Sequence, residues 1–408
     1  MFKRDLKTSP GGDATKQLKT VAGVFAALVL AAGGTARAEE PEPPARTVQF
    51  NLQYNAGVMA VVDGGLRLGA DFVDGLDVSG DFDLDRAFGW QGLSAHFDLM
   101  ANSGRLPSER AGSALGINGD EVEDRRLRLG QAYVQKRFAD GRGDLLIGYY
   151  DIGSDFYTLE AAESLVGAGS GLAPELGESG PNGPSDAPET ALTARLKLHP
   201  SETSYLQMMV ADGMAGVFGD ADGPDFDFRD GLLVVAEAGL EGRGKLAFGV
   251  WRYTKDQPDL RDMTPGGDPV SRAAQGAYVL GQAPLAGGDD DPRRSTLFAK
   301  AGLSDGATTP FSGSWTLGVR VEQVWAARPD SSLTFAVTQG RFTGRHRANE
   351  AAAGRDIGPS ETDLELTYAD RIGERVVIQP DLQWIHDPSG DRDVDDALVV
   401  GLRVTLEL

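Results

Sequence analysis

The chain has 408 residues, of which 41% are hydrophobic, so it can bury a large core. With 61 acidic against 39 basic residues its formal net charge is −22, which disfavours binding to nucleic-acid backbones and anionic membrane surfaces. Because the sequence has no cysteine, a disulfide framework and thiolate metal sites are excluded.

The first 38 residues have the three parts of a secretory signal peptide. Five lysines and arginines precede the apolar run VAGVFAALVLAA (21–32), and the small residues Ala36 and Ala38 follow it. The run is shorter than the roughly 20 residues of a transmembrane helix, so we expect cleavage after Ala38 and export. Loss of this segment removes six basic and two acidic residues and lowers the net charge from −22 to −26. We expect residues 39–45 to be a short periplasmic segment and residues 46–408 to form one domain.

After residue 46 the dominant pattern is alternation of apolar and polar residues, which is typical of β-strands. In 396–408, every even position from Leu398 onward is Leu or Val, whereas the odd positions include Arg403 and Glu407. No later stretch reaches 18 apolar residues, so no transmembrane helix is expected. An exported chain without such helices can still cross a bilayer as a closed β-barrel.

The alternation predicts about sixteen strands, and many have the roughly 9–11 residues that cross a bilayer when tilted. Their expected spans are 46–55, 71–84, 91–101, 126–137, 143–151, 190–199, 203–211, 229–240, 244–254, 273–280, 295–303, 313–323, 331–340, 360–369, 374–385 and 396–408.

The connections between these strands alternate in length. Those after even-numbered strands are mostly short, such as 139–143 and 200–202, and those after odd-numbered strands are mostly long. Two connections break the rule, because 304–312 is short and 281–294 is long. A membrane barrel has this asymmetry, since short turns face the periplasm and long loops face the exterior. The last strand is expected to pair with the first and leave no free edge.

The polar face of the strands is too charged for a dry core. Burying unpaired groups such as Lys197, Asp381 and Arg403 would cost several kcal/mol each, whereas they are stable in a water-filled channel. The apolar face should therefore contact lipid, and a cylinder of about sixteen strands is wide enough for an aqueous pore. We predict an all-β fold, a transmembrane antiparallel β-barrel with short periplasmic turns and long extracellular loops.

Three short motifs look like ligand or catalytic sites but do not fit them. Segment 239–246 (GLEGRGKL) has leucine where a phosphate-binding loop needs Ser or Thr. Segment 302–306 (GLSDG) matches a nucleophile-elbow pattern by chance in a chain with 54 glycines. In the acidic segment 219–230, Pro224 stands at a calcium-ligand position. We expect no catalytic residue and no cofactor, although peripheral calcium on the acidic loops stays open. The histidines show no metal-binding spacing; they are His96, His199, His346 and His386.

The longest expected extracellular connection is 152–189. Loops beyond about 15 residues are usually functional or disordered. Folded into a wide barrel, this one would narrow the channel and control its selectivity. A surface loop outside the pore is the alternative.

The chain resembles the carbohydrate-selective porins of the OprB type. The resemblance lies in segments 69–104, 126–156 and 365–390, and its most specific part is QPDLQ (379–383) before a turn containing Pro and Gly. It implies a sixteen-stranded barrel in the outer membrane of a Gram-negative bacterium that admits sugars by diffusion. The implied partners are outer-membrane lipid and lipopolysaccharide, the barrel assembly machinery and small sugars, with no nucleic acid. Both a monomer and a trimer are compatible with the sequence.

Inward polar and aromatic side chains near a loop-narrowed constriction can bind sugar hydroxyl groups and rings. The candidates for pore-lining and constriction residues are Arg195, Lys197, Arg320, Glu322, Arg403, Asp155 and Tyr157. The strong acidity also fits a general diffusion porin that favours cations. Two further alternatives are an outer-membrane barrel enzyme, such as a protease or lipase, and a secreted lectin-like β-protein.

The last residue departs from the porin family, whose barrels commonly end in an aromatic residue that the assembly machinery binds. We predict that Leu408→Phe improves insertion into the outer membrane, measured as the heat-modifiable fraction in membrane extracts. Normal assembly after deletion of the last three residues would contradict this role of the C-terminus.

Overall fold

In a computed structural model, residues 47–408 are described apart from 123–124, 217–222, 224–225, 227 and 288–290. The expected signal peptide (1–38) and segment 39–45 lie outside the described residues, as does much of the acidic segment 219–230. Among the helices that are described, none is long and apolar enough to cross a membrane.

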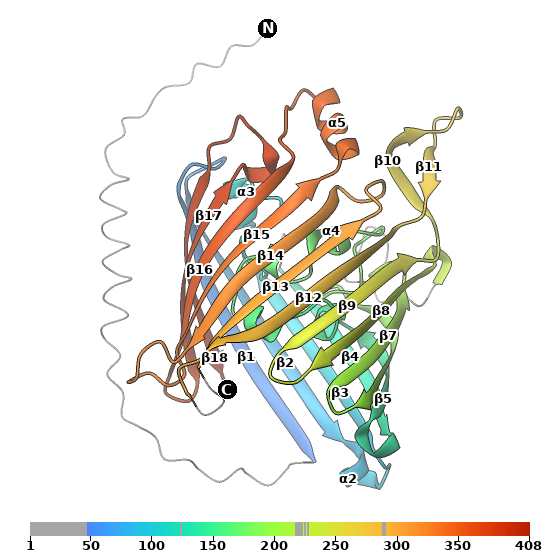
Figure 1. Cartoon of the computed structure of the whole chain (residues 1–408), viewed down its shortest axis with the longest axis vertical. Coiled ribbons are helices and arrows are strands. Elements are labelled where there is room, and N and C mark those ends of the chain that lie inside the picture. The colour runs from blue at the N-terminus through green and yellow to red at the C-terminus, as the bar shows by residue number, and fades with distance from the viewer. Residues whose placement is uncertain (1–46, 123–124, 217–222, 224–225, 227, 288–290) are drawn as a thin grey trace. The chain divides into compact units, whose positions relative to one another are not determined.

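Sixteen strands in the described part of the chain form one closed barrel (Figure 1). They are β1 Val48–Asp63, β2 Gly69–Asp83, β3 Leu93–Ser103, β4 Arg126–Phe138, β5 Gly143–Tyr150, β6 Ala191–Ser201, β7 Ser204–Asp212, β8 Leu232–Glu241, β9 Lys245–Tyr253, β12 Gln275–Ala286, β13 Ser295–Ser304, β14 Phe311–Glu322, β15 Ser332–Phe342, β16 Ser360–Ile372, β17 Val376–His386 and β18 Ala397–Glu407. Each pairs antiparallel with its neighbours, and β1 closes the barrel on β18 with Tyr54 opposite Leu406. The predicted fold class and the pairing of first and last strands are confirmed.

The remaining elements are short. A two-stranded hairpin, β10 and β11, lies outside the barrel sheet, so β9 pairs directly with β12. Their bounds are β10 Gln257–Met263, β11 Pro269–Arg272, α2 Leu84–Phe88, α3 Pro107–Ala111, α4 Pro174–Gly177, α5 Gly344–Ala352, and the 3-10 turns η1 Ala139–Gly141, η2 Ile152–Ser154, η3 Glu160–Ala162, η4 Ala168–Ser170, η5 Phe228–Asp230 and η6 Pro388–Gly390.

The predicted strand faces agree with the structure. In β6, Leu196 is 39% exposed on the outside of the barrel, whereas the adjacent Arg195 is 5% exposed and points inward. In β14, Leu317 is exposed and Thr316 is buried. An apolar exterior against lipid and a polar interior therefore hold for these strands.

Two strands are longer than predicted, and one predicted loop contains a hairpin. β1 runs to Asp63, so most of the connection expected at 56–70 is strand, and β12 runs to Ala286. The reason in β1 is that Met59 and Val61 are apolar yet face inward, where they pack with Ile117 and Val166. The apolar–polar alternation stops where the barrel interior is filled by loops, and the strand signal disappears with it.

The β10–β11 hairpin is joined to α5 by an ion-pair network centred on Asp259. This carboxylate accepts bonds from Arg345 Nε at 3.0 Å and from Arg272 Nε at 3.0 Å. It also accepts the backbone N–H groups of Arg261 and Asp262, each at 2.9 Å. Burial raises the pKa of Asp259, but these hydrogen bonds outweigh it and hold the pKa well below the usual 3.8.

We predict that acid releases this hairpin. A carboxyl group whose pKa is lower in the folded than in the unfolded protein stabilises the folded state fully at pH values above its unfolded pKa. This stabilisation is lost as the pH falls from the unfolded pKa through the folded pKa. Protease cleavage within 257–272 should therefore increase several-fold below about pH 4 in the isolated barrel. Asp259→Asn should show the same cleavage at pH 7, whereas Asp268→Asn at the hairpin turn serves as the control. Equal cleavage of both variants at pH 7 would contradict the role of Asp259.

Candidate functional site

The long connection between β5 and β6 folds into the barrel, where α4 lies within the ring of strands (Figure 1). Its residues Ile152, Phe156 and Leu176 are fully buried and pack against inward side chains of the wall, including Trp251 and Tyr278. We call residues 151–190 the constriction loop. Of the two alternatives, the structure has the loop inside the barrel.

A glutamate on the wall holds the first part of the constriction loop. Glu237 of β8 accepts the backbone N–H of Tyr157 at 3.2 Å. It also accepts the hydroxyl groups of Tyr205 at 2.6 Å and Tyr278 at 2.7 Å. The Tyr157 ring stacks on Tyr278 with centroids 4.0 Å apart. Its hydroxyl donates to Glu175 of the same loop at 2.7 Å. Tyr157 is thus a buried anchor of the loop.

The later part of the loop is held from the opposite wall. Glu365 of β16 accepts the backbone N–H groups of Val166 and Gly167, the latter at 3.1 Å. Between β16 and β8 along the wall, Lys300 of β13 donates to the carbonyl oxygens of Ser170, at 2.6 Å, and Gly171. Folding into the barrel removes the backbone N–H and C=O groups of the loop from water. Side chains of the wall therefore supply the hydrogen bonds that these groups would otherwise lack.

A second loop, 104–125, is held in the same way. Glu361 of β16 accepts the backbone N–H of Ala114 at 2.8 Å and that of Leu115 at 3.0 Å. Gln383 of β17 donates to the Ile117 carbonyl at 2.8 Å. These contacts correct the expectation that the inward charged side chains lie in a water-filled channel, because some of them are buried against the loops. Asp381 is only 1% exposed and is bonded by Gln383.

The two loops and the wall enclose a cavity of about 380 Å³. Much of its lining is glycine and alanine, including Gly119, Gly153 and Ala162, so backbone groups border the passage. Arg403 of β18 lies at its edge and binds Asp120 Oδ2 and Asn118 Oδ1, both at 2.9 Å. We call this region the constriction. Its charged lining residues are Asp120, Asp151, Glu163, Asp186, Lys300 and Arg403.

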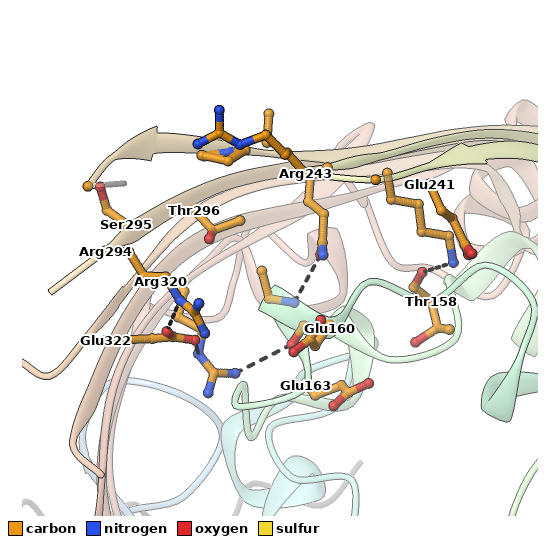
Figure 2. A pocket seen from close by; sticks show the side chains of 18 residues that line it. Thr158, Glu160, Glu163, Glu241, Arg243, Arg294, Ser295, Thr296, Arg320 and Glu322 are labelled. Carbon is orange, nitrogen blue, oxygen red and sulfur yellow. Dashed lines mark hydrogen bonds and ion pairs between the residues drawn. The ribbon is translucent and has the colours of Figure 1, made fainter. Parts of the chain in front are cut away.

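A second cavity of about 530 Å³ lies between the constriction loop and the short-turn end of the barrel. In Figure 2, Glu160 and Glu163 of the loop face Arg320 of β14. Arg320 Nη1 donates to the Glu160 carbonyl at 3.4 Å, and its Nε lies 4.0 Å from Glu322. Arg294 also pairs with Glu322. We call this cavity the periplasmic vestibule. It offers a solute both donors and acceptors.

The seven predicted site residues fall into three places. Arg403 and Tyr157 line the constriction, and Arg320 and Glu322 line the periplasmic vestibule. The base of the constriction loop is held by the other three and by Tyr157 as well; the three are Arg195, Lys197 and Asp155.

The loop base depends on one carboxylate. Arg195 Nη2 lies 3.0 Å and Lys197 Nζ 3.8 Å from Asp155, and Arg195 also pairs with Asp144 of β5. Gln207 donates to the Asp155 carbonyl at 2.9 Å. Two inward cations on β6 therefore fix the point where the loop leaves the wall.

Sequence reasoning missed several residues of the constriction. Asp120 and Lys300 carried no signal, because their shared position depends on how two loops fold inside the barrel. Glu163 and Asp186 both lie in the connection 152–189, for which a position inside the barrel was one of two expected alternatives, so these two residues were within reach.

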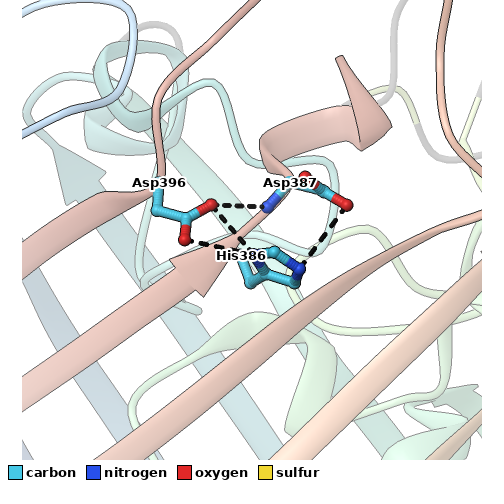
Figure 3. A group of neighbouring side chains, drawn as sticks. All are labelled: His386, Asp387 and Asp396. Carbon is cyan, nitrogen blue, oxygen red and sulfur yellow. Dashed lines mark hydrogen bonds and ion pairs between the residues drawn. The ribbon is translucent and has the colours of Figure 1, made fainter. Parts of the chain in front are cut away.

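One group of side chains could hold a metal ion among the residues the structure describes. His386, Asp387 and Asp396 each offer a ligand atom within 4.8 Å of the others (Figure 3). His386 Nδ1 lies 3.0 Å from Asp396 Oδ1, and its Nε2 lies 3.6 Å from Asp387. All three are at least partly exposed, and these pairs account for the arrangement without an ion. We assign no metal here, although histidine spacing alone had given no hint of the group.

Known porins resemble this chain in sequence and in fold. The sequence profile described as carbohydrate-selective porin, OprB family, matches residues 69–408. Porin B of Pseudomonas aeruginosa is 24% identical over 396 residues, which cover 87% of this chain and 86% of that protein. The high-pH structure of Pseudomonas putida OprB superposes with a TM-score of 0.79 at 20% identity, covering 89% of this chain and 94% of that chain. The low-pH structure of the same protein gives 0.58 at 17% identity, covering 89% and 93%.

A glycine on the wall leaves room for the loop anchors. A Cβ at Gly302 of β13 would lie 2.0 Å from Glu175 Oε1 and 2.1 Å from the Tyr157 hydroxyl. We predict that Gly302→Ala displaces this pair, destabilises the barrel by about 1–3 kcal/mol and makes the single-channel conductance larger and noisier. Gly344→Ala, at the start of α5 with nothing within 4 Å of the added atom, is the matched control. Identical conductance of both variants would show that the anchor does not fix the pore size.

Proposed function

This chain belongs to the OprB family of carbohydrate-selective porins and is an outer-membrane channel; from that premise we propose that sugars cross it through the constriction and the periplasmic vestibule. The observation that carries the proposal is the chemistry of these two regions. Each combines acidic acceptors and basic donors on its lining, which matches a solute covered in hydroxyl groups.

The ion pairs at the passage support exchange of hydrogen bonds with a passing solute. The Arg403–Asp120 pair is 20% and 29% exposed at its two side chains, so a sugar hydroxyl can replace bound water there. Arg320 and Glu322 are exposed to a similar degree. We therefore assign solute contact to these residues and a positioning role to Arg195, Lys197, Asp155 and Tyr157.

Small residues at the constriction support a solute that passes without a tight fit. Glycine and alanine at Gly119, Gly153 and Ala162 leave peptide groups at the passage, and these bind hydroxyl groups weakly. Conduction needs contacts strong enough for entry and weak enough for release.

A second function, a general channel that favours cations, is supported by the charge of the constriction. Four carboxyl groups line it against two cations, and burial beside Asp151 raises the pKa of Asp186 well above its usual range, so Asp151 and the exposed Glu163 carry the excess negative charge. Arg403 is paired with Asp120, and Lys300 is 5% exposed and bonded to two carbonyls. The uncompensated carboxylates attract cations. Neutral sugars and cations can share this route.

The channel assignment also bears on catalysis, cofactors, export and membrane insertion. We propose that it carries out no catalytic step and binds no cofactor, and that residues 1–38 are removed on export. We also propose that the barrel assembly machinery inserts the barrel among outer-membrane lipids.

Planar-bilayer recordings test both functions. We predict stepwise conductance that added glucose reduces and a reversal potential that favours cations in a salt gradient. Glu163→Gln removes a carboxylate exposed in the constriction and should lower the cation-to-anion ratio about two- to threefold, because one unit charge at a narrow site changes ion entry by this order. Glu202→Gln, in the periplasmic turn between β6 and β7, is the control.

The outcomes separate the two functions. Conductance that no sugar reduces would remove the carbohydrate proposal and leave the cation channel. A reversal potential at zero in the wild type would remove cation preference and leave the sugar channel. A lack of stepwise conductance would contradict both.

A further inference from the structure

A groove of about 630 Å³ lies on the outward face of the barrel across β8, β9, β12 and β13. That the groove faces outward follows from the alternation of side chains along the strands. Glu237 and Trp251 are buried inside the barrel, and Glu237 binds the constriction loop. Their neighbours Ala236 and Val250 therefore point outward, into the membrane.

The groove arises from an alternation of small and large side chains across the sheet. Ala236 lies opposite Val250, Val250 opposite Ala277, and Ala277 opposite Leu303. Val250 is 43% and Leu303 58% exposed, so they form ridges, whereas the two alanines form the floor. The result is an apolar groove that runs along the strands and has a shape that suits an extended acyl chain.

A basic group stands at one end of the groove. Arg252 is the penultimate residue of β9, which starts at the periplasmic turn 242–244, so it lies at the extracellular side. It is exposed and has no hydrogen-bond or ion-pair partner among the described residues. The nearby carboxylate of Asp305 is already bonded to the N–H groups of Ala307 at 2.7 Å and Thr308 at 3.0 Å.

An arginine on the lipid-facing surface is unfavourable unless its guanidinium reaches an anion near the headgroups. A phosphate suits it, because guanidinium binds phosphate oxygens through two parallel hydrogen bonds. At the extracellular side the lipid of the outer leaflet supplies that phosphate. An inner-leaflet phospholipid would place its phosphate at the opposite end of the groove, away from Arg252.

We propose that this groove binds one molecule of lipid A from the outer leaflet. An acyl chain lies over Ala277 between the ridges of Val250 and Leu303. One lipid A phosphate is held by Arg252. The site is separate from the constriction and the periplasmic vestibule, so its occupancy is independent of solute transport.

The test is native mass spectrometry of the delipidated barrel titrated with purified lipid A. Wild type should bind one lipid A, and Arg252→Gln should bind it about tenfold more weakly, as loss of one charge-assisted hydrogen-bond pair implies. Ala277→Phe fills the floor and should abolish binding. Arg341→Gln is the matched control, because Arg341 is also exposed on the outward face at the extracellular end of a strand, β15, and does not line the groove. Heat-modifiable migration verifies that each variant is folded.

Three outcomes would overturn the proposal. Equal lipid A affinity of Arg252→Gln and Arg341→Gln would remove the phosphate contact. Equal binding of phosphatidylglycerol and lipid A by the wild type would show a groove that does not distinguish the outer-leaflet lipid. A wild-type dimer that Ala277→Phe converts to monomer would show that a second copy of the barrel covers the groove.

Discussion

The interaction on which this channel depends is the bond between inward carboxylates of the wall and the backbone N–H groups of the inserted loops. A loop inside a barrel loses water from its peptide groups and needs acceptors there. Glu237, Glu361 and Glu365 supply them from two regions of the barrel wall. Each carboxylate is in turn stabilised by the donors it accepts, so the burial of the charge and the position of the loop support one another.

This constraint shapes the passage that remains. Because both loops are held at several points, the constriction is bordered by peptide groups and a few fixed charges. The Arg403–Asp120 pair is placed by the same loop that Glu361 holds. A channel built in this way has firm contacts between loop and wall and weak, water-exposed contacts toward the solute, as transport by diffusion requires.

The strand pattern was readable because each barrel strand has one face in lipid. Leu196 and Arg195 differ in exposure as their alternation predicted. The pattern failed at Met59 and Val61, where both faces of β1 are apolar because loop residues fill the interior beside them. The predicted site residues show the same limit. Alternation marked Arg195 and Arg403 as inward, but it could not tell that Arg195 holds the loop while Arg403 borders the passage.

The sequence by itself determined the barrel, its strand number, the direction of its two faces and the short turns at one end, since these follow from local period-two chemistry against lipid. Only the tertiary structure decided which inward charges line water and which are buried as anchors. Whether Asp381 meets water or an amide depends on loops more than 200 residues away along the chain, such as the one at Ile117. No local pattern records such a distant partner, because the partner comes close only when the loops fold into the barrel.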